Sequence, residues 1–154
     1  MTAGNRAIWF DRAHRDATYI DIRPGVSPDI IADSRQLPEE VGEGFGLIVF
    51  DPPHENYGAA GRMSHNYGHH TRAEIRNIIE RSSKEAYRVS TPDALMAFKW
   101  NDTAMKLAAA LALMPDWEPL FGHGVSHQQR RSSTSWVMLR KKQLTAYQRP
   151  EGER

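Results

Sequence analysis

Hydrophobic and polar residues alternate along this chain in blocks that predict strands and helices in turn. Short apolar or β-branched runs predict strands, and apolar positions three or four residues apart predict helices. The predicted elements are a helix at 5–15, strands at 17–22, 30–33 and 46–51, a helix at 71–90, a strand at 94–99, a helix at 101–113, and two antiparallel strands at 118–121 and 135–139. This order favours an α/β fold, a mostly parallel sheet with helices on both faces and a C-terminal antiparallel hairpin.

Boundary signals are clearest for the helix at 71–90. Thr71 and Glu74 have the spacing of a capping box, in which each side chain satisfies the other residue's backbone N–H. Thr91-Pro92-Asp93 ends the same helix. The connections 52–70 and 122–134 show no such pattern, and loops of this length in small domains commonly bind ligands or cover a site.

Composition narrows the class of protein. The 154 residues correspond to one domain, which we place at 1–142, followed by a polar tail at 143–154. A net charge of +1 offers no general attraction for polyanions, so a nucleic-acid site has to be a local patch. The absence of cysteine excludes disulfides, thiolate metal sites and cysteine nucleophiles. No apolar run is long enough to span a membrane and no signal-peptide core is present, so we expect a cytoplasmic protein.

The strongest candidate for chemistry lies where the strand at 46–51 ends. There the sequence reads Asp51-Pro52-Pro53, and because proline cannot donate to a sheet ladder, the chain must leave the sheet at this point. In α/β folds ligands bind at the carboxyl ends of the strands. A carboxylate beside backbone groups that can only accept hydrogen bonds suits an amino group on a planar ring. An ordinary turn that ends a strand is the alternative interpretation.

Four short segments together carry a family resemblance. They are Gly4-Asn5-Arg6 with Trp9-Phe10, Asp21-Ile22-Arg23, Asp51-Pro52-Pro53-His54, and Phe98-Lys99-Trp100-Asn101. In this order they resemble the class I S-adenosylmethionine (SAM)-dependent methyltransferases of the Asp-Pro-Pro-Tyr type, and more narrowly small phage or prophage DNA-methyltransferase-like proteins. The resemblance covers residues 2 to about 142, and it implies a Rossmann-like methyltransferase sheet.

The resemblance also implies roles for individual residues. The catalytic set would be Asp51, Pro52, Pro53 and His54, where Asp51 and the Pro52 carbonyl accept the two hydrogens of an amino group. Cofactor binding would fall to Gly4 and Asn5 at the amino-acid end of SAM, where a helix beginning at Asn5 would direct its N–H groups at the carboxylate. Asp21 would hold the ribose, Ile22 would pack on the adenine, and Asp33 with Ser34 would contact the adenine amino group.

Target binding is expected from side chains in the two long connections and from one strand end. Tyr57 and Tyr67 could stack on bases, and a duplex target would need base flipping. The other candidates for contact with nucleic acid are Lys99, His123, Gln129, Arg130 and Arg131. His65, His69 and His70 invite a metal interpretation, but their glycine-rich context and the lack of an acid among them favour no metal.

Two departures from the family pattern leave alternatives open. The first strand of the family is missing ahead of Gly4, so we expect either that translation starts upstream or that another segment, such as Leu144–Gln148, fills the gap. His54 also stands where the family has a larger aromatic residue. The favoured function is methyl transfer to an exocyclic amine, of a nucleobase in DNA. The alternatives are an RNA or small-molecule methyltransferase and a non-catalytic protein that binds SAM or a nucleotide.

Overall fold

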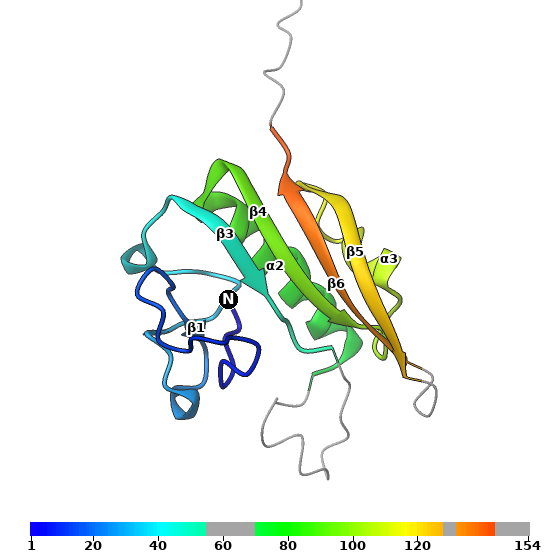
Figure 1. Ribbon diagram of the computed structural model, residues 1–154, viewed down its shortest axis with the longest axis horizontal. Coiled ribbons are helices and arrows are strands. Elements are labelled where there is room, and N and C mark those ends of the chain that lie inside the picture. The colour runs from blue at the N-terminus through cyan, green and yellow to red at the C-terminus, as the bar shows by residue number, and fades with distance from the viewer. Residues whose placement is uncertain (55–69, 128–131, 144–154) are drawn as a thin grey trace, which may run out of the picture.

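Two sheets of different size organise the chain. Figure 1 shows the computed structural model, which describes residues 1–54, 70–127 and 132–143. The larger sheet has the order β3-β4-β6-β5, with β3 parallel to β4 and the other pairs antiparallel. Its strands are β3 (Phe45–Phe50), β4 (Ser90–Asn101), β5 (Trp117–His127) and β6 (Ser132–Lys141). The smaller sheet is the parallel pair β1 (Ile20–Asp21) and β2 (Ile30–Ile31).

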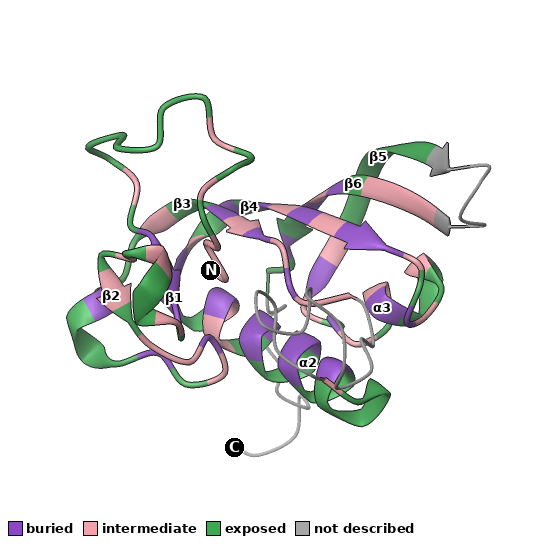
Figure 2. Cartoon of the chain, turned by 90° about the horizontal axis from the view of Figure 1, so that it is seen from below, coloured by how far each residue is buried: buried purple, intermediate pink, exposed green. Residues whose placement is uncertain are grey.

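The helices lie on one face of the larger sheet. These are α2 (Arg72–Val89) and the short α3 (Leu107–Leu111), and Figure 2 shows both beneath the strands. Two 3-10 turns, Pro24–Val26 and Glu39–Val41, belong to the N-terminal third. The opposite face of β5 and β6 carries no helix of the described part, so the expectation of helices on both faces is wrong for these strands. None of the described helices has the length and apolar character needed to cross a membrane.

A single hydrophobic core joins the larger sheet to α2. Alternate residues of β4 point to the helix side, where Phe98 and Trp100 are fully buried and stack with ring centroids 5.8 Å apart. Phe50 of β3 adds a third ring, 5.8 Å from Phe98. The face of α2 predicted from its spacing supplies Ile75, Ile78, Ile79, Ala86 and Val89. The apolar periodicity of the sequence therefore located the core correctly.

Side chains form hydrogen bonds with backbone groups at both ends of α2. Thr71 Oγ1 accepts the Glu74 N–H at 3.2 Å, and the Glu74 carboxylate accepts the Thr71 N–H at 2.6 Å, which confirms the capping box. At the other end the Lys141 ammonium of β6 donates to the carbonyls of Tyr87 and Ser90 at 2.6 and 2.8 Å. A cation at this end also complements the helix dipole.

The capping box gives a first prediction for stability. We expect Thr71→Ala to lower the free energy of unfolding by about 1 kcal/mol, because the Glu74 N–H loses its acceptor. Thr71→Ser keeps a hydroxyl at the same position and is the matched control, which we expect to unfold close to the parent. Urea denaturation followed by circular dichroism measures both. Equal stability of the alanine and serine variants would contradict this role of the cap.

Three predicted elements differ from the structure. Residues 5–15 form turns rather than a helix, since Thr2, Gly4 and Arg6 have positive φ angles, and the side chains of Asn5 and Asp11 accept the N–H groups of the residues two further on. The helix predicted at 101–113 is reduced to Leu107–Leu111. The predicted loop 122–134 is largely strand, because β5 and β6 pair from Trp117 with Lys141 to His127 with Ser132.

The two sheets do not pair with each other. β3 is the edge of the larger sheet and β1 belongs to the smaller one, and no strand of the described residues lies between them. Met1–Gly4 crosses one end of this gap, where the Ala3 N–H donates to the Ile20 carbonyl at 2.9 Å. The segment 144–148, named above as a candidate to fill the gap, lies outside the described residues.

Candidate active site

The carboxyl ends of β1 and β3 are joined by the first four residues of the chain. The Met1 ammonium donates to the Val49 carbonyl at 3.0 Å, and Thr2 Oγ1 donates to the Asp51 carbonyl at 2.9 Å. On the other side, the Gly4 N–H donates to Asp21 Oδ2 at 2.8 Å. Two predicted site acids, Asp21 and Asp51, therefore lie on either side of one short connection.

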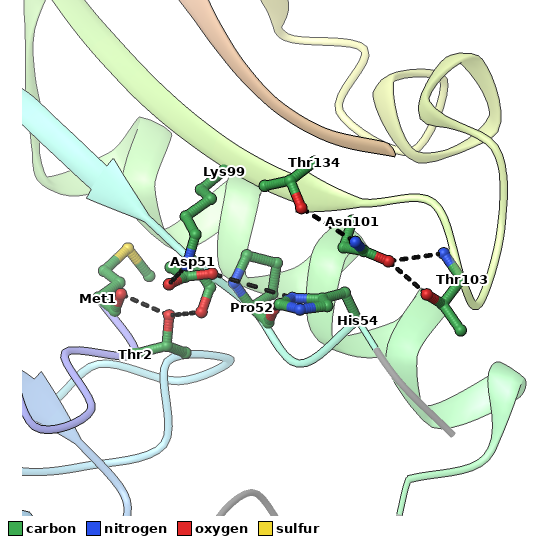
Figure 3. A network of polar contacts seen from close by, with 9 residues as sticks. All are labelled: Met1, Thr2, Asp51, Pro52, His54, Lys99, Asn101, Thr103 and Thr134. Carbon is green, nitrogen blue, oxygen red and sulfur yellow. Dashed lines mark hydrogen bonds and ion pairs between the residues drawn. The ribbon is translucent and has the colours of Figure 1, made fainter. Parts of the chain in front are cut away.

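Asp51 presents a partly exposed carboxylate at this edge. Its side chain is 23% exposed and it contributes to the wall of a cavity. Oδ2 accepts the Lys99 ammonium at 2.8 Å, and Oδ1 lies 3.9 Å from Nδ1 of His54 (Figure 3). A carboxylate with one oxygen anchored by a cation and the other open to an incoming group can accept a further hydrogen bond. The structure thus leaves Asp51 able to act as an acceptor, and its catalytic role stays a prediction.

The Pro52 carbonyl, the second predicted acceptor, already has a partner. His54 Nδ1 lies 3.1 Å from the Pro52 oxygen, and because a carbonyl can only accept, this nitrogen carries the proton. The imidazole also packs edge-on against Trp100, with ring centroids 6.2 Å apart. The imidazole therefore folds back onto its own motif, and an amino group would have to share the carbonyl with this contact through the second lone pair or displace it.

Lys99 lies beside the motif, and its predicted contact with the target stays a prediction. Its ammonium donates to Asp51. The strand register would have shown this: Phe50 is paired with Phe98, so the next residue of each strand, Asp51 and Lys99, lies at the same level on the same face. The ion pair between Lys99 and Asp51 is thus a contact that sequence reasoning did not assign.

A second polar group, next to the motif, fixes the end of β4. Asn101 Nδ2 donates to Thr134 Oγ1 at 3.0 Å, which ties β4 to β6. Its Oδ1 accepts the Thr103 N–H at 3.1 Å and also the Thr103 hydroxyl, as Figure 3 shows. The segment that follows returns to the motif, because the Ala104 N–H donates to the His54 carbonyl at 3.2 Å. This network connects the end of β4 to the backbone carbonyl of His54.

Most of the predicted cofactor residues lie at the carboxyl ends of β1 and β2, and Gly4 and Asn5 lie before β1. Asp21 is buried, and its carboxylate accepts hydrogen bonds from Gly4 and from the backbone and guanidinium of Arg23. Burial alone would raise the pKa of Asp21, but these hydrogen bonds outweigh it and the pKa is lowered. Ile22 is exposed directly after Asp21. Both oxygens of Asp21 are engaged, so a ribose could bind it only in exchange for one of these donors.

Asp33 and Ser34 follow β2, and their side chains point to different environments. The Asp33 carboxylate stays partly exposed and holds the Arg35 guanidinium, which lowers the pKa of Asp33. The Ser34 hydroxyl is instead buried against Ser82 of α2, with the two oxygens 2.7 Å apart. A cofactor contact by Ser34 would therefore have to come from its backbone. Asn5 begins a turn, not a helix, so the expected row of helical N–H groups is absent there.

The predicted target-binding residues are only partly described. Tyr57, Tyr67, Gln129, Arg130 and Arg131 lie outside the described residues, as do His65 and His69 of the metal alternative. His123, expected in a loop, is a residue of β5 and is paired in register with Trp136. Among the described residues no group of three or more histidines and acids is arranged to hold a metal ion.

The buried Met1 ammonium makes a pH-dependent prediction. Burial lowers its pKa from 8.0 to about 6, against the opposing effect of Asp21 and Asp51. Between pH 6 and 8 the unfolded chain therefore binds more protons than the folded chain, so stability rises with pH across this window. A shift of this size corresponds to about 2–3 kcal/mol between the two limits.

Amino-terminal acetylation is the control for this prediction. We expect urea unfolding at pH 6 and pH 8 to show the rise in protein whose mass confirms an intact Met1. The acetylated chain has no titrating amine and should show a smaller rise, and the difference between the two forms isolates the effect. An identical pH profile for both forms would contradict the assignment.

Comparison with known proteins supports the fold. No protein-family model matches the chain, and no curated protein matches its sequence. Among solved structures it is similar to the N-methyltransferase NodS from Bradyrhizobium japonicum WM9 in complex with S-adenosyl-L-homocysteine, with a TM-score of 0.53 and 14% identity over 80% of this chain and 65% of that one. TrmN from Thermus thermophilus matches with a TM-score of 0.48 and 18% identity over 77% of this chain. The chain spans 30% of the length of TrmN. The fold is thus a Rossmann-like methyltransferase fold.

Proposed function

We propose that this protein is a SAM-dependent methyltransferase of the Asp-Pro-Pro-Tyr type, which methylates an exocyclic amino group of a nucleobase in DNA. One observation carries the proposal: the Asp51 carboxylate stands at the carboxyl end of β3, partly exposed at a cavity and held by Lys99. The fold that the chain shares with the N-methyltransferase NodS also supports methyl transfer as the function. We infer that the methyl group is transferred to an amine because Asp51 and the Pro52 carbonyl can both accept hydrogen bonds from N–H groups.

The residues at the ends of the neighbouring strands could bind SAM if one existing hydrogen bond to Asp21 is replaced. Ile22 offers an exposed apolar side chain for an adenine ring, and the partly exposed Asp33 carboxylate can accept from its amino group. Asp21 can hold ribose hydroxyls if the half-exposed Arg23 guanidinium releases one of its oxygens. SAM, when bound, would supply an electrophilic methyl group and leave as a neutral thioether, and the proton displaced from the methylated amine would pass through the Asp51 carboxylate to water.

Asp51 and its neighbours would prepare the acceptor amine. An amino group on an aromatic ring is a weak nucleophile because its lone pair is delocalised. Hydrogen bonds from the amine to Asp51 and to the Pro52 carbonyl would favour a tetrahedral nitrogen with a localised lone pair, and Lys99 fixes the carboxylate in place. Positioning and electrostatic stabilisation then supply most of the rate. His54 would leave the carbonyl and stack on the base ring.

The nucleic-acid contacts complete the proposal. A flipped base would be stacked by His54 together with Tyr57 or Tyr67, and the backbone and neighbouring bases would be bound by Gln129, Arg130 and Arg131. His123 can join this set only if the target extends along β5. SAM is the cofactor and DNA the partner in this proposal, and no metal takes part in it.

Radiolabelled SAM tests the proposal directly. The protein is incubated with labelled SAM and, in separate reactions, with duplex DNA, RNA and small aromatic amines. Label in DNA supports the proposal, while label only in RNA or in a small amine supports the corresponding alternative. Calorimetric titration with SAM is run in parallel, and a protein that does not bind SAM would contradict every version of the proposal.

A non-catalytic protein that binds SAM or a nucleotide is the second candidate. The observation that favours it is the state of the motif: Lys99 occupies one Asp51 oxygen and His54 occupies the Pro52 carbonyl. A motif closed on itself can bind a ligand nearby without accepting an amine. Tight SAM binding with no transfer to any substrate class would favour this candidate.

A further inference from the structure

The outer edge of β5 has no strand beside it among the described residues. β5 is the outermost strand on the side of the larger sheet opposite β3, and it pairs with β6 alone (Figure 1). Across residues 118–127, no described segment other than β6 forms a backbone hydrogen bond with β5. An edge strand uses half of its backbone groups in the sheet, so the outward N–H and C=O groups of β5 are available to a further strand.

The two halves of this edge differ in how well they are protected. Near its start, β5 contains Pro119, the ion pair of Glu118 with Arg140, and an irregularity in register between Pro119 and Phe121. Proline, charged side chains and bulges are the features that keep edge strands from pairing with other chains. Residues 120–127 include no Lys, Arg, Asp, Glu or Pro. The second half of the edge is therefore unprotected.

The unprotected half is also exposed and apolar on one face. Phe121 is 69% exposed and Val125 is 50% exposed. They share a face of the strand with His123, because side chains in a strand alternate between its two faces. Gly122 and Gly124 carry no side chain, and all five residues are exposed. The segment 121–125 thus combines an accessible backbone with apolar side chains that a partner strand could cover.

The sequence of this segment reads almost the same in both directions. Phe121-Gly122-His123-Gly124-Val125 has a glycine on each side of a central histidine and a large apolar residue at each end. If two copies lie antiparallel about a two-fold axis at His123, each Phe121 is opposite a Val125 and each Gly122 is opposite a Gly124. An aromatic residue opposite a β-branched one is a favourable cross-strand pair, and here it occurs twice. A second copy of the chain therefore matches this edge.

We propose that two copies of this protein pair through the segment 121–125 of β5, antiparallel and with His123 at the two-fold axis. The two larger sheets then form one continuous sheet, and each copy contributes the same surface. The interface is small, so we expect a Kd in the micromolar range, and unfolding experiments at lower concentration measure the monomer. The proposal does not depend on methyl transfer, and β4 and β6 separate this edge from β3 and the amino-terminal segment.

Sedimentation equilibrium of the intact protein, from submicromolar to near-millimolar concentration, measures the association. We expect a reversible equilibrium between monomer and dimer. Val125→Lys places a charge on the unprotected edge, and because it acts twice in a symmetric dimer it should raise the Kd at least tenfold. Leu47→Lys is the matched control, since Leu47 is 53% exposed on β3, the other edge strand of the larger sheet. It should change the Kd less than twofold.

Single cysteines test the register of the pairing, because the chain has none of its own. We expect His123→Cys to form a disulfide-linked dimer on mild oxidation with diamide, since the two copies of this position face each other at the axis. Phe121→Cys alone should not, because its two copies would be about 13 Å apart along the strands, beyond the reach of a disulfide. A mixture of Phe121→Cys and Val125→Cys should give the mixed dimer. Gels run without reductant measure all three.

Three results would overturn the proposal. The first is a monomer at every concentration, which is the result expected if another segment of the protein or a different partner covers the edge. The second is equal weakening by the two lysine variants, which would place the interface elsewhere. The third is equally efficient cross-linking through positions 121 and 123, which would exclude the proposed register. Methylation is not a readout here, so failure of this proposal is separate from failure of the proposed function.

Discussion

Asp51→Asn is expected to reduce methyl transfer by about 10²–10³-fold, the usual cost of removing one key electrostatic group from an active site. Asparagine has nearly the same shape and can still contact Lys99, but its amide is a weaker acceptor and directs an N–H₂ group to one side. Because Asp51 is not one of the predicted cofactor residues and the substitution keeps its shape, SAM affinity should change little. The measurements are initial rates with labelled SAM and calorimetric titration of the same preparation.

Glu118→Gln is the matched control for this substitution. Glu118 is a partly exposed acid that accepts from Arg140 at 2.6 Å, and it belongs to the strand farthest from β3 in the larger sheet. We expect transfer to stay within twofold of the parent, since exposed ion pairs contribute little. An Asp51→Asn protein that binds SAM and transfers methyl at the parental rate would remove Asp51 from the mechanism.

Phe98→Ala should cause a large loss of stability. Phe98 is 0% exposed and its ring lies between those of Phe50 and Trp100, so truncation removes buried contacts and leaves a cavity. Substitutions of this kind cost about 3–5 kcal/mol, which is a large share of the about 5–15 kcal/mol that stabilises a typical domain. Urea unfolding followed by circular dichroism measures the loss.

Phe121→Ala removes the same side chain from an exposed position and is the control. Phe121 of β5 is 69% exposed, so we expect a change within about 0.5 kcal/mol. If Phe98→Ala does not fold, Phe98→Leu gives a smaller loss that can be measured. Equal effects of the alanine substitutions at 98 and 121 would contradict the position assigned to the core.

The sequence predicts those elements whose signals are local. The capping box at Thr71 and Glu74 and the spacing of the isoleucines define α2 to within about a residue, because a helix shows one face to a single core. The β-branched run that ends at Asp51 likewise predicts β3, since the prolines after it cannot stay in a sheet. For these elements the local preference and the tertiary environment agree.

Other elements are decided by tertiary partners that a local pattern does not contain. The apolar residues of 5–15 resemble a helical face, but Phe10 is exposed and no described helix forms there. In β5 and β6 the ladder extends well beyond the predicted strands, because each strand supplies the other's hydrogen bonds. Gly122 and Gly124 suggest a loop from sequence, yet Gly122 lies so close to Trp136 that a Cβ would be 2.8 Å from its carbonyl oxygen.

The residues of the candidate site also differ in whether local sequence or a distant partner defines them. Asp51 could be proposed from the sequence because the strand before it and the prolines after it indicate an acceptor at a strand end. Lys99, Thr2 and the inward position of Ser34 could not, because each is defined by a partner about 48 or 49 residues away. Only the register of β3 on β4 brings Lys99 to Asp51, and the register is a property of the assembled sheet.

The edge-on packing of His54 against Trp100 has a practical consequence. The indole of Trp100 is fully buried, and its Nε1 donates to the Met105 carbonyl at 3.0 Å. Movement of the His54 imidazole away from the indole would therefore change the environment of Trp100. Intrinsic emission from this tryptophan should therefore respond when an acceptor draws His54 away from the Pro52 carbonyl. The chain carries its own optical reporter, and the opening of the motif could be followed in real time without any attached dye.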